Sequence, residues 1–174
     1  MFKEFDILKI FFEEPSREFN VREVARLLKL APATASKELK EFAKQGILKE
    51  RKERMLILYK SNLDHELYQD LKKFYILRIL KDSQFIDGLN KFYLKPTIVL
   101  FGSAATGLDI EDSDLDLVIF TEKKKDFPKI SEFEKKFQRK IQMFIISDIK
   151  ELKNEHLMNN VLNGIVIQGE IKWI

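Results

Sequence analysis

The sequence predicts an α+β fold in two parts of different charge that are joined by a helical segment. Apolar residues recur at helical spacing through the first half of the chain, whereas short β-prone runs between turns are typical of the second half. Residues 1–95 hold 20 Lys and Arg against 15 Asp and Glu, a net charge of +5. Residues 96–174 hold 11 against 13, a net charge of −2. This asymmetry indicates two parts with different partners.

The composition argues against several classes of site. The chain of 174 residues has no cysteine, which excludes a disulfide, a cysteine-based zinc site and a thiol nucleophile. Its two histidines, His65 and His156, lie far apart in sequence, which disfavours a histidine-rich metal site or a Ser-His-Asp triad. No apolar run approaches the roughly 20 residues of a membrane span, and acids interrupt the apolar N-terminal stretch, unlike in a signal peptide. We therefore expect a cytoplasmic protein without a membrane partner.

Residues 1–61 are predicted to begin with three helices. Apolar residues at positions 8, 11 and 12 follow helical spacing, and Pro15 ends this first helix. Asn20 and Glu23 have the form of a capping box, which predicts the start of a second helix. After a turn at residues 29–31, Pro32 suits the first position of a third helix.

A small hairpin is predicted to follow the third helix. Gly46 suits the position just after the helix end. Residues 47–51 and 55–59 are β-prone, and three charged residues separate them. The first part of the chain therefore ends as an antiparallel pair of strands.

Three helices followed by a hairpin resemble the winged helix-turn-helix domain of many transcription regulators. The resemblance covers residues 2–61 and is strongest in LLKLAPATASKELKEFAKQGIL. In that family the third helix enters the major groove and the hairpin contacts the flanking backbone. Carried over by position, the DNA-binding residues are Thr34, Ser36, Lys37 and Lys40 on the helix and Arg51, Lys52 and Arg54 on the wing.

The charge of this region suits DNA, and a second interpretation stays open. Residues 29–60 hold nine basic and four acidic residues, which is the sign that phosphate contact requires. The alternative is that the same fold serves as a protein-interaction or dimerisation module whose lysines are ordinary surface residues.

Residues 62–94 are predicted to form a helical linker. Apolar spacing predicts a long helix over residues 63–81, and Ser83 is placed to cap another helix that runs to Tyr93. Two faces of this segment are apolar. They could pack against the winged helix, against a second subunit in a homodimer, or within an intramolecular core.

Residues 95–174 are predicted to form a small mixed sheet with helices. The predicted strands are Thr97–Phe101, Asp114–Thr121, Ile141–Ser147 and Gly164–Ile167, the predicted helices are Ser131–Arg139 and one beginning near His156, and a last apolar segment is Ile171–Ile174. Gly102 and Ser103 follow the first strand at once.

Two aspartates lie in the second of these strands. Because strand side chains alternate, Asp114 and Asp116 are expected on one face. Two carboxylates so close repel each other unless a cation lies between them, and Mg²⁺ prefers such oxygen ligands together with substrate phosphates. The turn at Gly102 and Ser103 presents backbone N–H groups to an anion. Together these features indicate chemistry on a nucleoside triphosphate.

The spacing of these residues resembles the hallmark of the DNA polymerase β-like nucleotidyltransferase superfamily, in which Gly-Ser, ten residues and Asp-x-Asp follow a strand. The branch that it resembles is the minimal nucleotidyltransferases, small proteins that include antitoxins paired with a helical toxin. The resemblance implies that Gly102 and Ser103 bind the phosphates of an NTP. It implies that Asp114 and Asp116 are catalytic and bind Mg²⁺. A nucleoside monophosphate would then pass to a protein or RNA acceptor.

The chain departs from the family pattern at two positions. The family carries a third carboxylate on the next core strand, where this chain aligns Gln142; Asp148 could replace it only with a different register. Thr106 stands where many relatives carry an arginine. Two functions stay open: an active nucleotidyltransferase with a DNA-binding winged helix, or a DNA-binding regulator or antitoxin whose degenerate domain only binds nucleotide or a protein partner such as a toxin.

Overall fold

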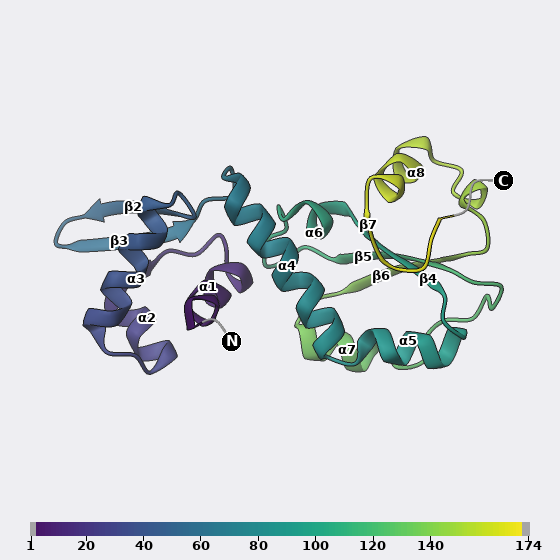
Figure 1. The fold of residues 1–174 in the computed structure, drawn as a ribbon, viewed down its shortest axis with the longest axis horizontal. Coiled ribbons are helices and arrows are strands. Elements are labelled where there is room, and N and C mark those ends of the chain that lie inside the picture. Colours follow the sequence, from purple (N-terminus) through teal and green to yellow (C-terminus); the bar gives the residue numbers. More distant parts are fainter. Residues whose placement is uncertain (1–2, 172–174) are drawn as a thin grey trace. The chain divides into compact units, whose positions relative to one another are not determined.

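The computed structural model describes residues 3–171, with side chains from Phe5 onward (Figure 1). It divides into two compact units, Met1–Tyr75 and Ile76–Ile174, and the boundary falls inside helix α4, Glu66–Asp82. Both units combine helices with sheets, so the predicted α+β class is confirmed. None of the helices in the described part of the chain combines the length and hydropathy that a membrane span needs.

The first unit contains a three-stranded antiparallel sheet of order β1-β3-β2. Its elements before α4 are α1 Lys3–Glu13, β1 Phe19–Asn20, α2 Val21–Leu28, α3 Pro32–Lys44, β2 Leu48–Glu53 and β3 Leu56–Ser61.

The capping signals of the sequence act as predicted in this unit. The Asn20 side chain accepts a hydrogen bond from the Glu23 backbone N–H at 3.0 Å, and Pro32 stands in the first turn of α3. Gly46 follows α3 with φ +79°, and a Cβ on it would lie 2.6 Å from the His65 ring. The end of α3 is therefore fixed both by its backbone conformation and by a packed side chain.

Aromatic residues fill the core of the first unit. Phe11 and Phe19 are fully buried, and their ring centroids lie 5.2 Å apart. The hydroxyls of Ser61 and Tyr68 both donate to the Phe11 carbonyl, at 2.7 and 3.0 Å. These bonds attach strand β3 and the first turns of α4 to the end of α1.

The second unit is a four-stranded mixed sheet of order β6-β5-β4-β7, in which only the β5–β6 pair is parallel among the described strands. After α4 its elements are α5 Phe85–Tyr93, β4 Thr97–Phe101, α6 Gly102–Thr106, β5 Leu115–Phe120, α7 Ile130–Phe137, β6 Ile141–Ile146, a 3₁₀ turn η1 Ile149–Glu151, α8 Glu155–Leu162 and β7 Ile165–Gln168.

Helices cover both faces of this sheet. Within the unit, α5 and α7 lie on one side of the strands and α8 lies on the other (Figure 1). Val99, Phe101 and Val118 pack in one cluster with Val161 of α8. The intervening strand residues are buried as well, which explains why β4 and β5 are apolar at nearly every position.

The structure refines two boundaries of the prediction, the start of β5 and the end of α7. Strand β4 has the predicted bounds, and β5 begins one residue after Asp114. Helix α7 ends at Phe137, so the prediction that Arg139 belongs to it is wrong: Gln138 adopts a left-handed conformation with φ 55°. The last predicted apolar segment ends in residues 172–174, which lie outside the described residues.

Candidate functional site

The register of the second sheet fixes the neighbours of Asp116. Asp116 on β5 lies opposite Phe101 of β4 and opposite Gln142 of β6. Residues that lie opposite each other in a sheet project to the same face, so Gln142 is the residue that shares a face with Asp116 on the next strand. The predicted alignment of Gln142 on the strand next to Asp116 is confirmed.

Asp148 follows the opposite end of strand β6 from Gln142. It lies six positions after Gln142, which corresponds to about 20 Å of extended chain. Its side chain caps η1 and accepts a hydrogen bond from the Lys150 N–H at 2.8 Å. The alternative register that would bring Asp148 to the aspartates is therefore wrong.

Gly102 lies against Asp116 on the β4 side of the site. It follows Phe101, the partner of Asp116, and has φ +72°. A Cβ on Gly102 would lie 2.3 Å from Asp116 Oδ2, so the carboxylate occupies the space that any other residue would need. Ser103 is half-buried in the first turn of α6, and its carbonyl accepts the Thr106 hydroxyl at 2.9 Å. The predicted phosphate-binding and metal-binding residues are thus adjacent.

The aspartates interact electrostatically. Burial, and then the negative charge of Asp114, raise the pKa of Asp116, and the positive charge of Arg139 acts in the opposite direction. Asp114 is exposed immediately before β5, whereas Asp116 is half-buried. A cation between them would remove the repulsion and replace lost hydration.

The donor set suits a hard cation. Two carboxylates and the amide oxygen of Gln142 are oxygen ligands, and Mg²⁺ usually takes one or two carboxylates together with substrate phosphates. Residues 3–171 contain no cluster of three or more His, Cys, Asp or Glu that could hold a metal alone. The two aspartates and Gln142 would therefore hold Mg²⁺ only together with phosphate oxygens that complete its shell.

The loop before β5 contains an interaction that the sequence did not indicate. Asp109 lies among the acidic residues of this loop but is only 1% exposed. Its carboxylate accepts a hydrogen bond at 2.7 Å from Arg139, which follows α7. This arginine supplies the counter-charge of Asp109 inside the fold. No spacing signal connects two residues 30 positions apart, and a single acid among several in a loop gives no sign of burial.

In the first unit, the predicted DNA-facing residues of α3 are mostly at the surface. Thr34, Lys37 and Lys40 are exposed, and Ser36 is half-buried beside the buried Ala35.

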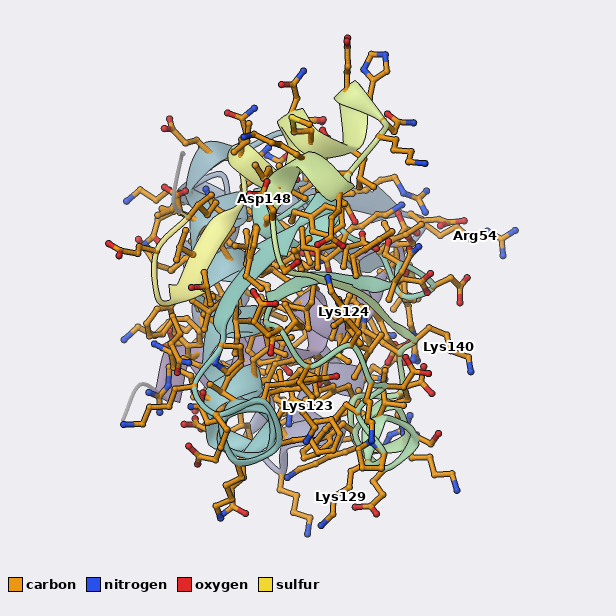
Figure 2. The ribbon with its side chains drawn as sticks, turned by 90° about the vertical axis from the view of Figure 1, so that its right-hand side faces the viewer. Arg54, Lys123, Lys124, Lys129, Lys140 and Asp148 are labelled. Atoms are coloured by element: carbon orange, nitrogen blue, oxygen red, sulfur yellow. The ribbon has the colours of Figure 1, made fainter. Side chains whose placement is uncertain are left out.

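The wing residues differ among themselves. Arg51 donates to both carboxylate oxygens of Glu18, at 3.0 and 2.6 Å, and to Glu53 at 2.8 Å. Its guanidinium is therefore already paired with two carboxylates at the surface. Lys52 and Arg54 are exposed, and Arg54 at the hairpin turn extends away from the ribbon (Figure 2).

Comparison with known proteins gives a match in the second unit. Residues 82–163 match the family model of the nucleotidyltransferase domain. Among solved structures, a "possible transcriptional regulator" from Methanosarcina mazei Go1 is similar at 18% identity and a TM-score of 0.36, over 49% of this chain and 78% of that chain. No curated protein matches the chain.

The matched range begins at the end of α4 and extends past α8. It contains Gly102, Ser103 and the two aspartates together with the register that joins them to Gln142. Residues 82–163 of this chain therefore belong to the nucleotidyltransferase domain family.

Proposed function

We propose that the second unit is a Mg²⁺-dependent nucleotidyltransferase that moves a nucleoside monophosphate from an NTP to a hydroxyl of a protein or RNA acceptor. The observation that carries the proposal is the contact between Gly102 and the Asp116 carboxylate. This contact brings the glycine turn, which has no side chain, next to the carboxylate of Asp116, and Asp114 supplies a second carboxylate. A metal-bound triphosphate needs both features, a backbone turn for its phosphates and carboxylates for its metal ion.

Each residue has a distinct role in this proposal. The backbone at Gly102 and Ser103 holds the terminal phosphates, and Asp114 and Asp116 hold Mg²⁺. The ion, when bound, offsets the charge that develops on the phosphate oxygens. The acceptor oxygen forms a bond to the α-phosphorus, the bond to the pyrophosphate oxygen breaks, and the hydroxyl proton passes to water, since Gln142 cannot accept it.

Labelled nucleotides test the proposal. Each of the four α-labelled NTPs is incubated with the protein, Mg²⁺, and total RNA or total protein as acceptor. We expect transferred label with wild-type protein and a loss of at least 100-fold in Asp114→Asn. Asp112→Asn, an exposed acid on the same loop, is the matched control and should transfer normally. Label that survives Asp114→Asn would contradict the assigned roles.

A second candidate function is nucleotide binding without transfer, in a DNA-binding regulator or antitoxin. The observation that favours it is the register of Gln142 opposite Asp116, because an amide offers neither the charge nor the basicity of a third carboxylate. In this case the wild type binds Mg²⁺ and ATP in calorimetry but transfers nothing, and Gln142→Glu gains transfer. Transfer by the wild type would refute this candidate.

We further propose that the first unit is a winged helix-turn-helix domain that binds DNA through α3 and the wing. Support comes from the exposure of Lys37 and Lys40 on α3 and of Lys52 and Arg54 on the wing. Removing one phosphate contact should weaken binding to all sequences and lower the salt slope by about 1. We expect this for Lys40→Ala in gel-shift titrations at several salt concentrations. Lys9→Ala, an exposed lysine paired with Glu13 on α1, is the control, and equal salt slopes in the two variants would contradict the proposal.

A further inference from the structure

Arg139 lies between α7 and β6 and contacts the loop that leads into β5. Its Nη1 donates to Asp109 Oδ2 at 2.7 Å, its Nε donates to the Ser113 carbonyl at 2.8 Å, and its Nη2 reaches the Asp114 carbonyl at 3.4 Å. One guanidinium therefore contacts the loop at three residues. The last of them is one of the two proposed metal ligands.

The ion pair between Arg139 and Asp109 is buried. The Arg139 side chain is 12% exposed and that of Asp109 is 1% exposed. Removing one partner of such a pair leaves an uncompensated charge in the interior, but replacing both by apolar residues is often neutral for stability. The pair therefore need not contribute to the free energy of unfolding. Its effect is on the loop conformation, because the planar guanidinium donates several hydrogen bonds in a fixed geometry that lysine cannot reproduce.

Short-range hydrogen bonds also shape this loop, whereas Arg139 approaches it from the far side of β5. Residues 107–114 lie between α6 and β5 without helix or strand. The Leu108 N–H donates to the Ser103 carbonyl at 3.0 Å, the Ser113 N–H donates to the Ile110 carbonyl at 3.0 Å, and the Ile110 N–H donates to the Ser113 hydroxyl at 2.9 Å. The chain beyond Arg139 pairs at once with β5, because the Leu115 N–H donates to the Lys140 carbonyl at 2.9 Å. Arg139 therefore connects the strand that carries Gln142 to the segment that carries Asp114.

From this geometry we infer that Arg139, with Asp109, is a positioning residue that sets Asp114 in place for Mg²⁺. The inference rests on the proposed function of the site. Residues that orient metal ligands from outside the coordination shell typically change metal affinity by about 10–100-fold. Arg139 contacts Asp114 through the backbone carbonyl of Asp114, so the expected effect is on the affinity for the cation.

The test measures cation binding without turnover. Mn²⁺, which carboxylates bind as they bind Mg²⁺, is titrated into the full chain and followed by electron paramagnetic resonance. We expect Mn²⁺ affinity to fall about 10–100-fold in Arg139→Lys, which keeps the charge but loses the fork. Lys140→Ala is the matched control, because Lys140 is 78% exposed and points away from the ribbon (Figure 2); it should bind as the wild type does.

A double variant separates positioning from folding. In Asp109→Leu/Arg139→Met both charges are replaced by apolar side chains, so thermal unfolding should change little, while Mn²⁺ affinity should stay reduced. Wild-type affinity in both the double variant and Arg139→Lys would overturn the inference. Failure of the wild type itself to bind Mn²⁺, with or without ATP, would instead refute the proposed function.

Discussion

The substitution Gly102→Ala tests the contact on which the site depends. Its cost has two sources that the structure separates. At φ +72°, an alanine in the left-handed region costs about 1–2 kcal/mol. Its Cβ would also lie 2.3 Å from Asp116 Oδ2, so the carboxylate must leave its rotamer, at about 0.5–1.5 kcal/mol. The expected loss of unfolding free energy is about 1.5–3.5 kcal/mol.

This loss is measurable by scanning calorimetry of the full chain. For a unit of about 100 residues, each kcal/mol lowers Tm by about 4–8 °C, so the transition of the second unit should move down by about 6–28 °C. Gly107→Ala is the matched control: Gly107 has φ +76°, so the change carries the same backbone strain. The difference between the two variants isolates the clash with the carboxylate.

A double-mutant cycle shows whether the clash is with Asp116. In Asp116→Ala the oxygens are gone, and the Asp116 Cβ lies 3.5 Å from the position of the new methyl, an ordinary contact. Gly102→Ala should therefore cost less in the Asp116→Ala background, with a coupling of about 0.5–1.5 kcal/mol. A coupling near zero, together with equal losses in the two glycine variants and unchanged Mn²⁺ affinity, would refute the reasoning.

Two further predictions concern pH. Asp116→Asn should raise Tm at pH 7 by a few degrees, about 1 kcal/mol, because burial and the charge of Asp114 raise the pKa of Asp116. A raised carboxyl pKa means that the folded chain binds the proton more tightly, so calorimetry should show this gain shrinking as pH falls below the raised pKa; a gain that persists at pH 3 would contradict it. Glu151→Gln should instead lower the stability at neutral pH. Lys124 and Ser147 lower the pKa of Glu151 to about 2, so its contribution is present above pH 4.5 and is lost toward pH 2. Urea unfolding should show a smaller effect of Glu151→Gln at pH 3 than at pH 7.

The parts of the site that could be predicted are those with local signals. Asp116 and Gln142 were correctly predicted on neighbouring strands. The signals were local: the alternation in DLDLVIFT, the turn after β4 and the apolar run of β6 each indicate a strand from adjacent residues alone. The Asn20 cap and Gly46 were predictable for the same reason. In each case the deciding interaction lies within a few residues of the signal.

The parts that could not be predicted depend on pairs that are distant in sequence. Arg139 reaches Asp109 across 30 positions, and Arg51 reaches Glu18 across 33 positions. A charged residue is interpreted as solvated unless its partner is known, so the sequence did not indicate the burial of Asp109 and predicted a DNA contact for Arg51. The second of these now requires that DNA displace a bidentate carboxylate, which makes Lys52 and Arg54 the better candidates on the wing.

The charges around Asp116 predict that Mg²⁺ and nucleotide bind cooperatively, whether or not transfer follows. Two carboxylates balance the charge of one divalent cation, and the neutral Gln142 on the next strand leaves no further negative charge for a second. A triphosphate brings its own negative oxygens, so binding of Mg²⁺ and nucleotide should be mutually reinforcing, with each ligand raising the affinity for the other by the same factor. Gln142→Glu should weaken this dependence, because a third carboxylate binds Mg²⁺ before the nucleotide arrives. The coupling factor is the ratio of the Mg²⁺ affinities with and without a non-hydrolysable ATP analogue. Titrations of Mg²⁺ measure this factor in the wild type and in Gln142→Glu. Equal factors would mean that Gln142 does not face the cation, and the register of β5 and β6 would then have no bearing on the chemistry.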